Sequence, residues 1–82
     1  MAAFRIMAIK TNSRTSNVDT LQKTLTKFGC NIKMRLGLHE AGDVCSDEGL
    51  ILLQLTDDRE EAEKLEEALS SIPGVSAKMI EL

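Results

Sequence analysis

Residues 50–82 read LILLQLTDDREEAEKLEEALSSIPGVSAKMIEL, and this stretch decides the fold because it contains a strand, a helix and a second strand in succession. Residues 50–56 are apolar on both faces, as in the central strand of a sheet. The aspartates at 57–58 offer a helix N-cap, and the dipeptide Pro73-Gly74 ends the helix that follows. Residues 75–82 then form the last strand.

The helix within this stretch is predicted from a cap at its start and an apolar stripe along one side. Glu61 follows Asp58 by three residues, which resembles a capping box. The glutamates of the first turn also interact favourably with the positive end of the helix dipole. The stripe that we expect to be buried consists of Ala62, Leu65, Leu69 and Ile72.

The first half of the chain repeats the same order of elements. Residues 4–11 are apolar and predict a strand. Gly29 offers a left-handed helix stop after apolar residues at helical spacing, which are Val18, Leu21, Leu25 and Phe28. Residues 32–38 alternate apolar and polar side chains, which predicts a half-buried edge strand. Residues 40–49 break every pattern and predict a long hairpin loop.

Six elements in the order β-α-β-β-α-β predict a single domain over residues 1–82. Two β-α-β units with right-handed crossovers give a ferredoxin-like α+β fold. This fold is a two-layer sandwich whose antiparallel sheet has the strand order 4-1-3-2. Both helices then cover one face of the sheet, and the other face has no cover within the chain.

The uncovered face predicts self-association, because both central strands carry apolar residues on each side. Soluble monomers rarely leave a large contiguous apolar patch bare. We therefore expect a homodimer or homotetramer whose interface contains Met7, Ile9, Ile51 and Leu53. The alternative is that one strand is misread by a residue, or that polar loops fold over the sheet.

Composition narrows the classes of function. The chain has 82 residues, with 10 Lys and Arg against 13 Asp and Glu, a net charge of -3 and two aromatic residues. It lacks the basic clusters and stacking aromatics of proteins that bind nucleic acid directly. No apolar run approaches the ~20 residues of a membrane span, and the N-terminus lacks a signal-peptide layout. We therefore expect a cytoplasmic protein without membrane contact.

Few residues are placed for chemistry. No acid with a base, nucleophile with a base or metal-ligand set stands at a suitable spacing, so we predict a non-enzyme without a cofactor. His39 and Cys45 are minor candidates for a metal or redox site, because the single histidine lies among acidic residues that we expect to be solvated. Cys30 follows a helix stop and is predicted to be a small buried filler.

The segment after the first strand is a candidate anion site. It precedes a helix N-terminus, whose free N–H groups and dipole attract a carboxylate or a phosphate. Asn12 and Ser13 would supply hydrogen bonds, and Arg14 would supply a bidentate clamp. The alternative is ordinary helix capping, which accounts for the side chains at 16–17. Further along, Gly37 within a strand predicts a bulge or the close approach of another backbone.

Three stretches of the chain resemble the ACT and ACT-like group of small regulatory domains. They are MRLGL at 34–38, GLILL at 49–53 and IPGVSAK at 72–78, of which the Arg35-x-Gly37 pattern is the more telling. Within that group the chain is most similar to the iron-only hydrogenase system regulators. These proteins are related in fold to the ligand-binding domain of the nickel-responsive repressor, and the resemblance covers nearly the whole chain.

The resemblance implies an oligomer joined through its sheets, a sensing or regulatory role and no catalysis. In ACT domains a small ligand, often an amino acid, lies at a subunit interface near the loop after the first strand. We therefore predict a regulatory module that binds a small anionic metabolite. Its candidate binding residues are Asn12, Ser13, Arg14, Arg35 and Gly37.

Two other functions stay open. One is an interaction module whose sheet or edge strand docks on a larger enzyme or transcription factor, with the acidic residues of 40–48 as a contact. The other is a metal or redox sensor that uses His39 and Cys45. Nickel sensing is not predicted, because the chain lacks the several histidines of that site.

Overall fold

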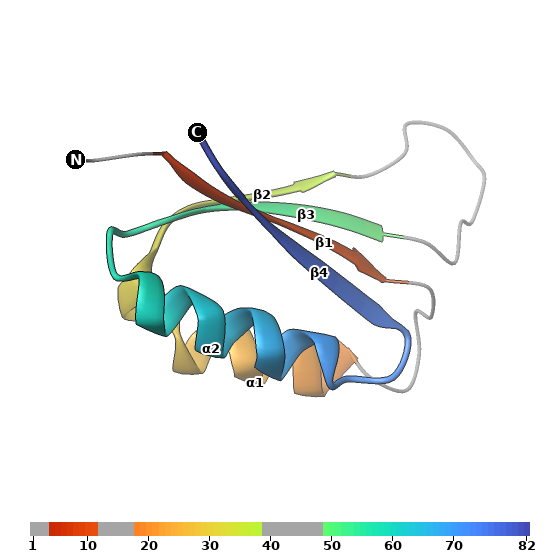
Figure 1. Ribbon diagram of the computed structural model, residues 1–82. Coiled ribbons are helices and arrows are strands. Elements are labelled where there is room, and N and C mark those ends of the chain that lie inside the picture. The colour runs from red at the N-terminus through yellow and green to blue at the C-terminus, as the bar shows by residue number, and fades with distance from the viewer. Residues whose placement is uncertain (1–3, 12–17, 39–48) are drawn as a thin grey trace.

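The computed structural model describes residues 4–11, 18–38 and 49–82. Figure 1 shows the predicted order of strands and helices, with a short 3-10 turn added before the second strand. The elements are β1 (Arg5–Thr11), α1 (Val18–Lys27), η1 (Gly29–Asn31), β2 (Ile32–Leu38), β3 (Gly49–Leu55), α2 (Arg59–Ser70) and β4 (Val75–Glu81).

The four strands form one antiparallel sheet in the order β2-β3-β1-β4, which is the predicted order 4-1-3-2 read from the other edge. β1 and β3 are central, and β2 and β4 are the edges. Both helices lie against the same face of the sheet (Figure 1). The predicted ferredoxin-like α+β sandwich is therefore confirmed.

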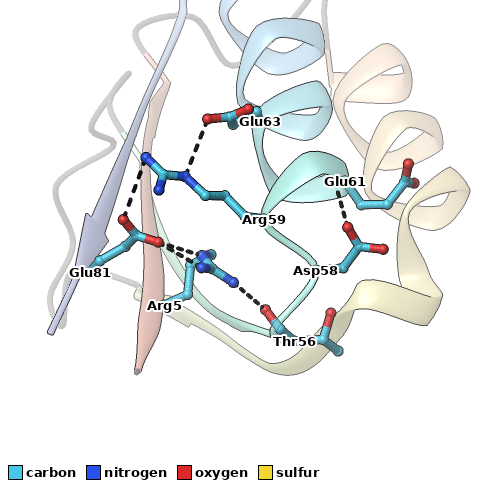
Figure 2. A network of polar contacts seen from close by, with 7 residues as sticks. All are labelled: Arg5, Thr56, Asp58, Arg59, Glu61, Glu63 and Glu81. Atoms are coloured by element: carbon cyan, nitrogen blue, oxygen red, sulfur yellow. Dashed lines mark hydrogen bonds and ion pairs between the residues drawn. The ribbon is translucent and has the colours of Figure 1, made fainter. Parts of the chain in front are cut away.

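Helix α2 begins as the capping pattern predicts. The Asp58 side chain accepts a hydrogen bond from the backbone N–H of Glu61 at 3.1 Å, which satisfies one of the free donors of the first turn (Figure 2). The helix is followed by Gly74, whose φ of 82° is a left-handed conformation that glycine adopts without strain. The buried side of α2 carries Ala62, Leu65 and Leu69, as predicted.

The core lies between the helices and the helix-facing side of the sheet. Met7 and Ile9 of β1 and Leu65 and Leu69 of α2 are fully buried in it. These residues belong to one cluster, which also contains Leu21, Leu25, Phe28, Leu53, Leu55, Ala62, Ile72 and Val75.

The residues expected on the uncovered face are on the other side of the sheet, so that assignment is wrong. Met7 and Ile9 are 0% exposed and Leu53 is 1% exposed, while Ile51 is partly buried against the same core. The register pairs Met7 with Leu53 and Ile9 with Ile51, so all four share the helix-facing side. The sequence alternates two apolar sets along each central strand, and only the packing of the helices selects which set is inside.

The uncovered side of the sheet carries the other apolar set, which we call the open face. Its most exposed described members include Met34, Leu36 and Ile80, which are 58%, 51% and 43% exposed. Strand register and alternation assign to it the following apolar residues with described side chains: Phe4, Ile6, Ala8, Met34, Leu36, Leu50, Leu52, Ile80 and Leu82. Every large hydrophobic residue that is exposed in the described part of the chain belongs to this face.

Candidate functional site

The five predicted ligand-binding residues fall into two groups. Asn12, Ser13 and Arg14 lie outside the described residues. Arg35 and Gly37 lie on the edge strand β2, where both are exposed. The structure therefore places two of the five and leaves the other three as predictions.

Arg35 and Gly37 lie on the helix-facing side of the sheet. Arg35 pairs with Leu53, and Gly37 pairs with Ile51. Because directly paired residues share a face, both β2 residues share the side on which Leu53 packs into the core. They stay exposed because they lie at the sheet edge, whereas the fully buried residues of the core lie on the central strands and α2.

Gly37 lies near the end of β1, which precedes the 12–17 segment in the sequence. Thr11 ends β1 and pairs with Gly49, two residue pairs beyond the row of Ile9, Ile51 and Gly37, so it shares the face of that row. β1 and β2 are separated by one intervening strand, which corresponds to about 10 Å between their backbones. Gly37 is thus on the helix-facing side near the Thr11 end of the sheet, whereas Arg35 lies at the middle of β2, in the row of Met7 and Leu53.

Two glycines lie on the helix-facing side near the end of β1. Gly37 of β2 and Gly49 at the start of β3 place no side chain there. An added Cβ at Gly37 would meet no described atom within 4 Å, and the register of β2 is regular at this position, so the expected bulge is wrong and no described backbone approaches closely. The irregularity in β2 lies near the start of the strand, between Ile32 and Met34. At Gly49 an added Cβ would lie 2.9 Å from Oγ1 of Thr11, so a side chain there would crowd the end of β1.

Arg35 has no ion-pair partner among the described residues, and its guanidinium is exposed. A planar guanidinium with free donors can bind a carboxylate or a phosphate in bidentate geometry. Together with the open space at Gly37, this arrangement can hold an anion.

A second arginine, which sequence analysis did not single out, lies at the other end of the sheet. Arg5 is 8% exposed and is the buried charged residue of the described chain. Its Nε and Nη2 donate hydrogen bonds to Oε2 of Glu81 at 2.9 and 2.6 Å, and its Nη1 donates to the carbonyl of Thr56 at 2.9 Å (Figure 2). The donors of its guanidinium are therefore largely used within the protein.

The Arg5 pair continues onto helix α2. Arg59 lies 4.0 Å from Oε1 of Glu81 through Nη2 and 3.4 Å from Oε2 of Glu63 through Nε (Figure 2). The hydrogen bonds from Arg5 lower the pKa of Glu81, and the charge of Arg59 adds to this effect. The network joins β1, β4 and the start of α2. We interpret it as a structural clamp, because its buried cation is already neutralised.

The predictions for the two cysteines and the histidine also fall partly outside the described residues. His39 and Cys45 lie outside the described residues. Cys30 is an exposed free thiol in η1, so its predicted burial is wrong. The buried position at this helix end is taken by Phe28, two residues earlier. No group of three or more potential metal ligands occurs among the residues that the structure describes.

None of the described helices is long and apolar enough to cross a membrane. No protein-family model matches the sequence, and no curated protein matches it significantly.

Solved structures do share the fold. An uncharacterized protein of Thermotoga maritima aligns with a TM-score of 0.83 and 25% identity over 96% of this chain and 95% of its own. The ACT domain of the GTP pyrophosphokinase of Chlorobium tepidum aligns with a TM-score of 0.70 and 15% identity over 96% and 100% of the two chains. CPII, a nitrogen regulatory PII-like protein of Thiomonas intermedia, was solved bound to ADP, AMP and bicarbonate. It aligns with a TM-score of 0.59 and 12% identity over 99% and 93%. The ACT and PII-like structures thus share an ACT-like arrangement of strands and helices with this chain.

Proposed function

We propose that this chain is a non-catalytic regulatory module that binds a small anionic molecule on the helix-facing side of the sheet, between the middle of β2 and the end of β1. Arg35 would bind the charged group, and the space beside Gly37 would admit it. Asn12, Ser13 and Arg14 would complete the site from the adjoining segment. At the level of the family, we propose that the chain belongs with the iron-only hydrogenase system regulators, which its sequence resembles.

The observation that carries this proposal is that Arg35 is a cation without an ion-pair partner among the described residues. The described acidic side chains that form ion pairs do so with Arg5, Arg59 and Lys64. Arg35 is exposed on the helix-facing side of β2 and forms no ion pair with a described residue. An exposed cation beside an open glycine position is suited to an anionic ligand.

The neighbours in fold support the choice of ligand class. The PII-like structure holds two nucleotides and bicarbonate, which are all anions. The ACT domain belongs to an enzyme that transfers pyrophosphate to GTP, as its name states. We therefore place nucleotides, bicarbonate and acidic amino acids first among the compounds to be tested.

A thermal-shift screen of the purified chain against ADP, AMP, bicarbonate and the amino acids tests the ligand proposal. A ligand present at ~100 times its Kd adds about 2.7 kcal/mol of stability, which is several degrees for a domain of this size. Arg35→Ala and Arg14→Ala should each remove most of the shift. Lys23→Ala, which removes an exposed cation of α1, should retain it. A shift that survives both arginine substitutions would place the ligand elsewhere.

We also propose that two copies of the chain associate through their open faces. Association would remove the exposed apolar side chains of this face from water, which is the main driving force for stable homodimers. A symmetric dimer uses the same face twice and leaves neither copy exposed.

Sedimentation equilibrium tests the association. Leu36→Glu combined with Ile80→Glu places two charges on the open face and should give the mass of a monomer. The matched control is Thr26→Glu, which adds a charge at an exposed position of α1. A native protein that already has the monomer mass at high concentration would contradict the dimer.

A further inference from the structure

The two edges of the sheet differ in whether their backbone is already occupied. On β4, the N–H of Met79 donates a hydrogen bond to Oε2 of Glu66 at 2.9 Å. Glu66 belongs to α2, which packs along β4 (Figure 1). A carboxylate on an outward N–H blocks the addition of another strand there. The β4 edge is therefore partly closed by the protein itself.

Hydrogen-bond alternation shows which backbone groups of β2 point away from the sheet. Phe4 and Leu82 exchange two backbone hydrogen bonds, at 3.2 and 2.8 Å. The even-numbered residues of β1 and β4 therefore form the hydrogen-bonded pairs between these two strands. Odd-numbered β1 residues then bond to β3, which leaves the even-numbered residues of β3 to bond to β2. Their partners are Met34 and Leu36, so the N–H and C=O of Arg35 and Gly37 point outward. The outward N–H of Met79 is consistent with this assignment.

The described hydrogen bonds leave these outward groups of β2 without a protein partner. No backbone or side-chain hydrogen bond that the described residues make involves Arg35 or Gly37 outside the sheet ladder. Gly37 has open space where a Cβ would be, so a neighbouring strand could approach it closely. β2 is therefore the edge at which the sheet can be extended.

The side chains of β2 indicate the chemistry of an added strand. The charged residues of this strand are Lys33 and Arg35, and it contains no acidic residue. A second copy that paired through its own β2 would bring two more cations and form no ion pair. A strand with acidic side chains would form cross-strand pairs with Arg35 on the helix-facing side. Its alternate apolar side chains would lie beside Met34 and Leu36 on the open face.

We propose that the β2 edge binds an extended acidic segment of a partner protein as a fifth strand of the sheet. The backbone of the segment exchanges hydrogen bonds with Arg35 and Gly37, and its acidic side chains lie beside Arg35. This is strand addition, in which main-chain hydrogen bonds give affinity and alternate side chains give specificity. The proposal shares Arg35 with the proposed ligand site, but it rests on the outward backbone groups of β2 and does not involve the open-face dimer.

A matched pair of variants at one position tests the proposal. Gly37→Pro removes the outward N–H but no ladder bond, and proline is tolerated on an edge strand at such a position. Gly37→Ala keeps the N–H, and its Cβ meets open space. The probe is a labelled peptide of alternating glutamate and valine, and binding is measured by fluorescence anisotropy. Gly37→Pro should weaken binding at least tenfold, while Gly37→Ala should bind within about twofold of the native chain.

Two further measurements keep the result interpretable. Amide exchange protection at Met79 reports that Gly37→Pro still forms the sheet, because this amide belongs to the opposite edge. A peptide of alternating lysine and valine should bind more weakly than the acidic one, and Arg35→Glu should reverse that order. Arg14→Ala should leave peptide binding unchanged, which separates this proposal from the ligand site.

The proposal is overturned if the acidic peptide does not bind, or if a folded Gly37→Pro chain binds it as tightly as the native chain. It is also overturned if Gly37→Pro halves the mass in solution, because a second copy would then occupy this edge.

Discussion

β1 and β2 are both seven-residue strands that contain one arginine among mostly apolar residues, yet the two arginines have different surroundings. In β1, Arg5 is 8% exposed and its guanidinium donates to Glu81 and Thr56. In β2, Arg35 is exposed and has no ion-pair partner among the described residues. β1 has a strand on each side and β2 has one free edge. The position of a strand in the sheet therefore decides whether a similar pattern builds structure or offers a binding surface.

The largest difference is expected for the methionines of the two strands. Met7→Ala removes a fully buried side chain of β1 and should cost about 3 kcal/mol of unfolding free energy through lost burial and a cavity. Met34→Ala removes an exposed side chain of β2 and should cost less than about 0.5 kcal/mol in the monomer. Urea denaturation at low protein concentration measures both. Equal costs would show that β2 is as buried as β1.

The two arginines should differ next. Arg5→Ala removes the buried cation and leaves the carbonyl of Thr56 without its donor, which should destabilise the fold by on the order of 2 kcal/mol. Arg35→Ala should change stability by less than about 0.5 kcal/mol while removing the ligand response. If Arg35→Ala destabilises the chain as much as Arg5→Ala, Arg35 is a structural residue and the proposed site is wrong.

The Arg5 clamp should also make stability depend on pH. Arg5 holds the pKa of Glu81 below its usual value, so the ionised carboxylate favours the folded state. This contribution is fully present above the pKa of the unfolded chain and is lost as pH falls through the lower pKa of the folded chain. Urea unfolding from neutral pH to about pH 3 should therefore show a shallower loss of stability for Glu81→Gln than for the native chain. Parallel curves would contradict the assignment.

The smallest effects are expected at the two glycines of the sheet end. Gly49→Ala brings a Cβ to 2.9 Å from Oγ1 of Thr11 and should cost about 1 kcal/mol, which Thr11→Ala should relieve in the double variant. Gly37→Ala should be neutral or stabilise by up to about 0.5 kcal/mol, because the position is open and its φ is not positive. Thermal unfolding of the four variants forms the test, and additive costs for Gly49 and Thr11 would exclude the contact.

The sequence was sufficient where the signal is local. The cap of α2 was predicted because Asp58 and Glu61 are three residues apart, and the stripe of the same helix because it follows the helical period. The strand order followed from the order of elements and the handedness of crossovers.

Sequence analysis was insufficient where the answer depends on residues far apart in the chain. Arg5 and Glu81 are 76 positions apart, and only strand pairing brings them together. The predicted interface failed for a related reason. Met7 and Ile9 belong to one apolar set of β1 and Ile6 and Ala8 to the other, and alternation alone gives no preference between them.

What the sequence determined by itself is the set of elements, their order and the fold that they form, because caps, stops and periodicity act between residues a few positions apart. What only the tertiary structure decided is which face of the sheet the helices cover, which arginine is neutralised and which edge stays open. These outcomes depend on packing and charge pairing between strands that are distant in sequence. Alternating side chains offer both faces of a strand equally, until a helix packs on one of them.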